Sequence, residues 1–168
     1  MNLYAAHLLE PAECQALIRV FELRAHESKE QDFSGQPVLR WPQFEEAGEY
    51  VCKCWAAAEN YTGHRIETTI LTRMGPGGWH EQHAANCRRD EAGKWVPNHT
   101  PQRTHTAIVY LNDGFDGGEL YFPQQDIDVW PKAGQIVIFS SDGEHEHGVR
   151  RMLCGERYSL AMWLQAPA

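Results

Sequence analysis

The stretch THTAIVYLNDGFDGGELYF, residues 104–122, decides the fold class of this chain. Two segments rich in β-branched and aromatic residues flank a glycine-rich turn, which is the pattern of two short strands joined by a loop. Similar segments follow at 127–130, 135–139, 147–149 and 157–164, and the turn sequences PKAG and SDGE separate them. Such a series of short strands predicts a sandwich or a jelly-roll-like barrel.

The residues before this series have a different pattern. The expected elements are helices over 9–27 and 43–60, a loop over 28–42 and a strand over 65–73. Helices followed by many short strands predict an α+β fold. We expect a single domain over the 168 residues, helical over 1–63, with a strand core over 64–168 and the helices packed on one sheet.

Composition excludes several classes of partner. The formal charge of −8 and the pI near 5.5 argue against a nucleic-acid-binding surface, which would need a basic stripe. No apolar stretch approaches the length of a membrane span, and the first residues have neither the basic nor the long apolar segment of a signal peptide. Five cysteines without framework spacing favour reduced thiols. These features predict a cytoplasmic protein with no nucleic-acid or membrane partner.

Two histidines are candidates for a metal site. His83 lies in HEQHAANC (80–87), after the expected strand 65–73, and His147 opens the short strand HGV. Two histidines and one carboxylate with open positions are typical of non-heme Fe(II) oxygenases. Arg157 follows ten residues after His147, on a strand face that also carries Ser159. A buried arginine is costly unless it meets an anion, and its planar fork suits a carboxylate.

Several of these segments together resemble a known family. The pieces GPGGWHEQH, HAANC, THTAIVYLNDGFDGGELYF, VWPKAGQIVIFSS, EHEHGV and GERYSLAMW resemble the prolyl-hydroxylase branch of the Fe(II)/2-oxoglutarate oxygenases, most closely the leprecan-like prolyl 3-hydroxylases. The resemblance covers roughly Thr72 to Leu164, and LLEPAECQALI is similar to the helix that precedes that core. It implies a double-stranded β-helix core, which is jelly-roll or cupin-like, with Fe(II), 2-oxoglutarate and O2.

The resemblance also implies residue roles. His83 and His147 would bind the iron. Arg157 would hold the distal carboxylate of 2-oxoglutarate, with Tyr110 supporting the same carboxylate and Ser159 facing the same way.

The chain departs from the hydroxylases at Ala85, where their His-x-Asp motif carries the third iron ligand. In this respect it resembles the Fe(II)/2-oxoglutarate halogenases, whose His-x-Ala or His-x-Gly motif leaves room for a halide. Chlorination of an unactivated C–H bond of a small molecule is then implied, by ferryl hydrogen abstraction and recombination with chloride. Asn86 could donate a hydrogen bond toward halide or substrate, or could serve as a turn residue.

Four alternatives remain open at this point. The chain could be a hydroxylase whose aspartate was replaced by alanine, naturally or by engineering. Another carboxylate could replace it; the candidates are Asp90, Glu81 and Glu119. A zinc site could form from His80, His83, Cys87 and His147. The chain could also be a non-catalytic module that binds metal or 2-oxoglutarate.

The substrate is expected near the glycine turn and the long polar segment 84–103, because a loop of that length is usually functional and often a lid. Trp79 and His80 lie at the expected mouth of the site. Arg103, with Arg88 and Arg89, could bind an anionic group. The expected substrate is a small molecule: an amino acid, a nucleotide or a carrier-bound group.

Overall fold

Seven antiparallel strands form the larger of the two facing sheets in the computed structural model, which describes residues 2–168. Their order across the sheet is β1 (Tyr4–His7), β11 (Gln135–Ser140), β8 (Arg103–Tyr110), β13 (Arg157–Gln165), β4 (Arg65–Met74), β3 (Pro37–Arg40) and β2 (Glu30–Gln31). The C-terminal strand β13 is therefore central, with β8 on one side and β4 on the other.

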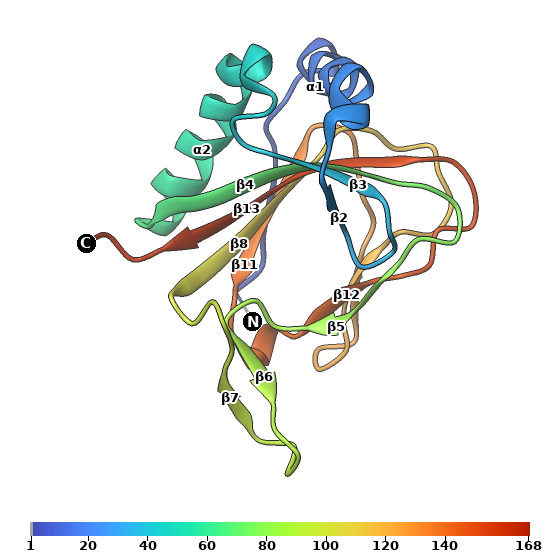
Figure 1. Cartoon of the computed structure of the whole chain (residues 1–168). Coiled ribbons are helices and arrows are strands. Elements are labelled where there is room, and N and C mark those ends of the chain that lie inside the picture. Colours follow the sequence, from blue (N-terminus) through green and yellow to red (C-terminus); the bar gives the residue numbers. More distant parts are fainter. Residues whose placement is uncertain (1) are drawn as a thin grey trace.

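The smaller sheet faces the larger one across the interior of the molecule (Figure 1). Its strands, in spatial order, are β10 (Ile127–Val129), β9 (Leu120–Phe122), β12 (His147–Val149) and β5 (His80–His83). The chain passes from β4 to β5, returns to β8, crosses again to β9 and β10, and then visits β11, β12 and β13 in turn. Residues far apart in the sequence thus meet between the sheets.

Two helices cover the outer face of the larger sheet (Figure 1). Helix α1 (Pro11–Arg24) begins with proline and a capping box, in which the Glu10 main-chain N–H donates to Glu13 Oε2 at 2.7 Å. Helix α2 (Gly48–Thr62) ends at Gly63, whose φ of 71° closes the last turn. Short 3₁₀ turns occur at Ala25–Glu27, Glu45–Ala47 and Gly143–His145.

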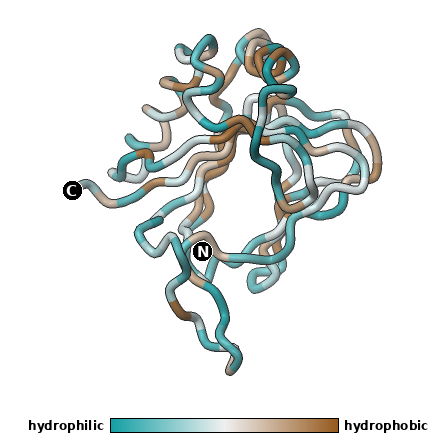
Figure 2. The backbone as a smooth tube through the Cα atoms, in the orientation of Figure 1, coloured by the Kyte–Doolittle hydropathy of each residue, from teal (hydrophilic) through white to brown (hydrophobic). Residues whose placement is uncertain are grey.

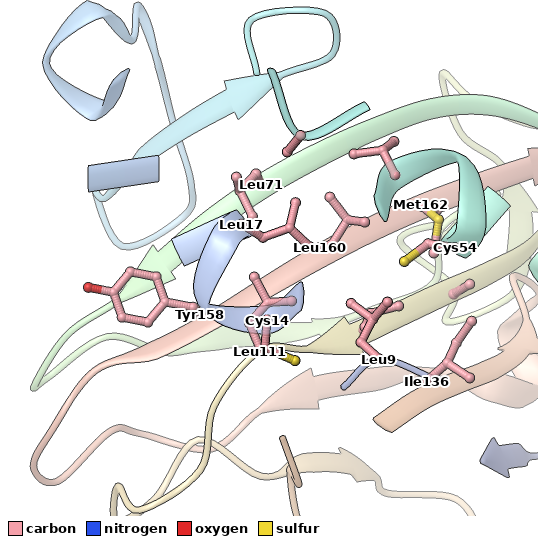
Figure 3. Packing of buried hydrophobic residues seen from close by; sticks show 14 of the residues in the cluster. Leu9, Cys14, Leu17, Cys54, Leu71, Leu111, Ile136, Tyr158, Leu160 and Met162 are labelled. Atoms are coloured by element: carbon pink, nitrogen blue, oxygen red, sulfur yellow. The ribbon is translucent and has the colours of Figure 1, made fainter. Parts of the chain in front are cut away.

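The main hydrophobic core lies between these helices and the sheet. Figure 3 shows Leu17 of α1 and Cys54 of α2 together with Leu71 of β4 and Leu160 and Met162 of β13, all fully buried. Hydrophobic residues accordingly concentrate along the strands beneath the helices in Figure 2. A smaller cluster fills part of the space between the two sheets; its members are Ile108, Tyr110, Leu120, Phe122, Val137 and Phe139. The remaining inter-sheet space is available for a site.

The expected mixed fold, mostly strands with two helices, is confirmed, but two segments differ from expectation. The region 1–63 is not purely helical, since β1, β2 and β3 lie in it and join the larger sheet. The segment 84–103 contains a hairpin, β6 (Cys87–Arg89) and β7 (Trp95–Pro97), which projects from the body of the molecule in Figure 1. These strands are two to four residues long, so they offer too few positions for a recognisable alternation. No helix within residues 2–168 is long and apolar enough to cross a bilayer.

Candidate active site

A cavity of about 380 Å³ lies between the two sheets. Its wall includes His83 and His147 from the smaller sheet and Arg157 and Ser159 from the larger one. Its size is in the range of small-molecule sites in proteins. The chain crossings described above are what bring these four side chains to one place.

His83 and His147 are directly opposite each other in the register of β5 and β12, with ring centroids 4.5 Å apart. Each ring nitrogen Nδ1 lies at hydrogen-bond distance from a main-chain carbonyl two residues earlier: His83 at 2.8 Å from Glu81 and His147 at 2.9 Å from His145. A carbonyl can only accept, so Nδ1 carries the proton in both rings and the Nε2 lone pairs are free. This is the arrangement that orients histidine as a metal ligand.

Both imidazoles are held in the neutral form. Burial lowers the pKa of His147 to about 3, and the neighbouring His83 contributes to the same shift. Burial also lowers the pKa of His83, against a smaller opposing effect of its hydrogen bond to the Glu81 carbonyl. A metal ion binds the neutral imidazole, so the pair is ready to bind one at neutral pH.

Arg157 is a buried cation, only 3% exposed, and it lacks an acidic partner within residues 2–168. Its Nη1 lies 3.5 Å from Ser159 Oγ, and its guanidinium lies 5.0 Å from the centre of the Tyr110 ring. Arg157 Nε and the Tyr110 hydroxyl are both buried without a hydrogen-bond partner in the described chain. Burial raises the pKa of Tyr110, so its hydroxyl remains a donor. Arg157 and Ser159 line the cavity and fit a carboxylate such as that of 2-oxoglutarate, whereas the fully buried Tyr110 contacts Arg157 without lining the cavity.

Gly118 makes room for this arginine and was not identified from the sequence as a site residue. Its φ is 74°, and a Cβ added there would lie 2.5 Å from Met152 Sδ and 3.1 Å from Arg157 Cδ. The repeated glycine in DGGEL was the available signal, because a left-handed position close to another chain segment requires glycine.

Ala85 follows β5 and lines the cavity, and it is only 5% exposed. Its main-chain carbonyl accepts hydrogen bonds from Thr100 Oγ1 at 2.8 Å and Asn98 Nδ2 at 3.3 Å. The segment after His83 is thereby fixed, and a methyl group stands at the position where the hydroxylase motif has a carboxylate.

Two alternatives for this position are wrong. Residues 2–168 contain no group of three or more His, Cys, Asp or Glu side chains placed to hold one metal ion. Asp90 instead caps the turn of the β6–β7 hairpin, and neither Glu81 nor Glu119 lines the cavity. The zinc set fails because Cys87 lines a separate surface pocket beside Trp95.

The remaining predicted residues divide into two groups. His80 and Arg103 line the cavity, as expected of substrate contacts. Asn86 does not: its side chain donates to the Arg103 carbonyl at 3.0 Å, so its placement at the site is corrected to a structural role. Trp79 is also corrected, since it is 43% exposed, lies outside the cavity and has Arg151 about 6.0 Å from its ring.

The loop between β2 and β3 forms part of the cavity wall, which the sequence did not indicate. Asp32 and Phe33 of this loop line the cavity. The Phe33 ring packs against His80 and His83, with centroids 5.3 and 5.6 Å apart. The segment was expected to be an ordinary loop because no local pattern indicates which distant surface a turn will meet.

Comparison with known proteins agrees with this geometry. A family model described as the 2OG-Fe(II) oxygenase superfamily matches residues 69–165. Prolyl 3-hydroxylase 2 of Mus musculus is 40% identical over 93 residues, which is 50% of this chain and 13% of that protein; prolyl 3-hydroxylase 3 of the same species has the same identity and coverage. The match therefore spans only a small part of those relatives.

Solved structures with a similar fold cover the whole chain. The viral collagen prolyl hydroxylase of Paramecium Bursaria Chlorella virus-1, in its 2OG complex, has a TM-score of 0.76 at 19% identity, covering 100% of this chain and 97% of that one. HygX from Streptomyces hygroscopicus, with nickel and 2-oxoglutarate bound, has a TM-score of 0.73 at 14% identity, covering 98% and 82%. At these identities the likeness concerns the fold.

Proposed function

Because the chain belongs to the 2OG-Fe(II) oxygenase superfamily, in the prolyl-hydroxylase branch, we propose that it is an Fe(II)- and 2-oxoglutarate-dependent halogenase that chlorinates a small molecule. In this proposal His83 and His147 hold the iron through Nε2. Arg157 holds the distal carboxylate of 2-oxoglutarate, and the Tyr110 and Ser159 hydroxyls share that carboxylate.

The arrangement of the strands supports the proposal of an Fe(II)- and 2-oxoglutarate-dependent enzyme. Four strands of the larger sheet (β4, β8, β11, β13) alternate along the chain with those of the smaller one, except that β9 and β10 are consecutive, as in a double-stranded β-helix. We propose that the helices and this core form a single domain, because α1 and α2 pack on the sheet that carries Arg157.

We also propose a cytoplasmic location. All five cysteines are free, which supports it.

The observation that carries the halogenase proposal is the methyl group of Ala85 in the cavity wall, two residues after His83. An iron ion with two neutral histidines and a dianionic cosubstrate lacks the negative charge of the family's aspartate. Chloride restores one negative charge and is small enough to occupy the space beside a methyl group, whereas a carboxylate side chain would fill it.

The bound cofactors would supply the oxidising chemistry: 2-oxoglutarate, O2, a substrate C–H bond, chloride and one proton from solvent would become succinate, CO2, water and a C–Cl bond. The chain itself does the positioning. Arg157 fixes the cosubstrate from the larger sheet, and the two histidines face it from the smaller sheet. His80 and Arg103 line the part of the cavity proposed for the substrate, where Arg103 would meet an anionic group of an amino acid, a nucleotide or a carrier-bound molecule.

An anaerobic titration with Fe(II) and 2-oxoglutarate tests this proposal. The visible charge-transfer band of the complex is recorded with sodium chloride and with sodium acetate at equal ionic strength. We expect chloride to strengthen or shift the band in the natural chain and to have no effect in Ala85→Asp. A band that ignores chloride in both proteins contradicts the halogenase.

Hydroxylation is the second candidate, and the 40% identity to prolyl 3-hydroxylase 2 over 93 residues favours it. In that case water replaces chloride beside Ala85. Product analysis distinguishes the two: hydroxylated product at every chloride concentration supports hydroxylation, and a chlorinated product that rises with chloride supports halogenation. A third possibility, a non-catalytic module that binds 2-oxoglutarate, predicts binding of the cosubstrate with no succinate formed.

A further inference from the structure

The chain contains the same Asp-x-x-Gly turn twice, and only one copy faces the cavity. In Asp32–Gln36, Asp32 Oδ1 accepts from the main-chain N–H of Ser34 at 2.8 Å and of Gln36 at 2.9 Å. In Asp90–Lys94, Asp90 Oδ1 accepts from the N–H of Ala92 and of Lys94, both at 2.9 Å. Gly35 and Gly93 have φ of 77° and 76°. The turn therefore accounts for Oδ1 of each aspartate and not for Oδ2.

The second oxygen distinguishes the two aspartates. The Asp32 side chain is only 8% exposed and lines the cavity, and its Oδ2 has one contact, His80 Nε2 at the long distance of 3.4 Å. Burial raises the pKa of Asp32, but hydrogen bonds from His80, the Gln36 N–H and Ser34 outweigh it and hold the pKa below its usual value. The cavity wall thus carries a carboxylate oxygen that the hairpin does not need.

The other charges of the cavity are balanced or already assigned. Arg40 Nη2 pairs with Glu30 at 2.7 Å, and Arg103 Nε pairs with Glu67 at 2.6 Å. Arg157 is the cation proposed to meet 2-oxoglutarate. Asp32 is the remaining acidic group in the cavity wall of the described chain, and it has no arginine or lysine partner there.

Phe33 adds an aromatic surface beside this carboxylate. Phe33 is 76% exposed, and its ring contacts His80 edge-on and His83 at a tilt, so it stands at the mouth of the cavity. A carboxylate next to an aromatic ring is a favourable environment for an organic cation, since both attract positive charge.

We propose that Asp32 is a specificity-determining residue that binds a protonated amine of the substrate through Oδ2, with Phe33 covering the adjoining alkyl chain. The substrate class is therefore a small alkylammonium compound. The inference rests on the proposed function only in taking this cavity as the place where substrate binds.

Calorimetric titration in the absence of oxygen and chloride tests the inference without any turnover. The protein is loaded with Fe(II) and 2-oxoglutarate, and the probes are hexylammonium and its neutral isostere 1-hexanol. Asp32→Asn keeps the oxygen that accepts the turn hydrogen bonds but removes the charge. Asp90→Asn makes the same change in the matching turn outside the cavity and is the control. The melting temperature of each variant shows how much the substitution destabilises the turn that contains it.

We expect the natural chain and Asp90→Asn to bind hexylammonium at least about tenfold more tightly than 1-hexanol, because the ammonium group forms both an ion pair and a hydrogen bond with the Asp32 carboxylate, whereas the hydroxyl forms only a hydrogen bond. Asp32→Asn should bind the two probes equally. No preference in the natural chain, no binding of the ammonium probe, or a preference that survives in Asp32→Asn overturns the inference. Loss of Fe(II) or 2-oxoglutarate binding in Asp32→Asn also overturns it, because Asp32 would then support the cofactor site. Failure of the halogenase test leaves these binding results readable, since chloride and O2 are absent.

Discussion

His83 and Arg157 approach the cavity from opposite sheets, His83 at the end of β5 and Arg157 at the start of β13. The histidine is neutral because burial lowers its pKa, and the arginine is a buried cation without an acidic partner in the described chain. His83 therefore offers a lone pair to a metal ion, and Arg157 offers a positive charge to a carboxylate. Together they fit a dicarboxylate cosubstrate that chelates the metal. The predictions below separate these roles.

Restoring a carboxylate at the cavity wall should change how the site binds metal. We expect Ala85→Asp to bind Fe(II) in the absence of 2-oxoglutarate about tenfold or more tightly than the natural chain, because a carboxylate that touches the metal matters more than groups that only hydrogen-bond to its ligands, whose loss already costs about 10–100-fold in affinity. Ala84→Asp is the matched control, since Ala84 is also buried and lines the cavity. Equal Fe(II) affinities in both variants, measured by competition with a chelating dye, would show that position 85 does not face the iron.

Removing the buried charge should have opposite effects on the empty and the bound protein. We expect Arg157→Met to raise the melting temperature without ligand, because an uncompensated buried cation is costly. Its affinity for 2-oxoglutarate should fall by roughly 2–5 kcal/mol, the usual cost of deleting one partner of a buried charge pair. Differential scanning fluorimetry and calorimetry measure the two quantities. Arg157→Lys keeps the charge but not the planar guanidinium, so its affinity for 2-oxoglutarate should lie between those of the natural chain and Arg157→Met. Unchanged 2-oxoglutarate affinity in both variants would show that Arg157 does not bind the cosubstrate.

Gly118 should tolerate no side chain. We expect Gly118→Ala to destabilise the fold by about 1–3 kcal/mol and to weaken 2-oxoglutarate binding, because the added methyl meets Met152 and Arg157 in a strained backbone conformation. Gly114→Ala is the control, since Gly114 has a φ of 81° but nothing lies within 4 Å of an added Cβ. Chemical denaturation and cosubstrate titration give both readouts. If the two variants lose 2-oxoglutarate affinity equally, backbone strain and not displacement of Arg157 explains the effect.

Four of the five free cysteines should react in a fixed order. Cys52 is exposed and should be alkylated first; exposed Cys154 should follow more slowly, because its hydrogen bond to Asp116 and the charge of that carboxylate raise its pKa. Cys14 and Cys54 lie in the core, and burial raises the pKa of Cys54 to about 12, so both should react only in denaturant. Peptide mass spectrometry after timed iodoacetamide treatment measures the order. Early labelling of Cys54 would mean that helix α2 detaches from the sheet.

The strands of the core and several cavity residues could be predicted because their signals are local. Segments such as QIVIF and RYSLAMWL have alternating or β-branched patterns of five and eight residues, and β11 and β13 lie where these patterns predict. The ten-residue spacing of His147 and Arg157 is likewise a local signal, which can be recognised in one sequence. The cavity placement of Asp32 could not be read this way, since it depends on a turn meeting a sheet fifty residues further along the chain. Asn86 and Trp79 were misplaced for the same reason: their positions follow from loops whose path is set by tertiary contacts.

The division of the cavity between two sheets has a mechanical consequence. The iron-binding histidines proposed here lie on strands of three and four residues in the smaller sheet, whereas Arg157 lies in the nine-residue strand at the centre of the larger one. A cosubstrate that contacts both sides would link the smaller sheet, with its short strands, to the larger sheet on which the helices pack. Amide protons of β5 and β12 would then exchange with solvent more slowly when the cosubstrate is bound, while the exchange of those of β13 would change little.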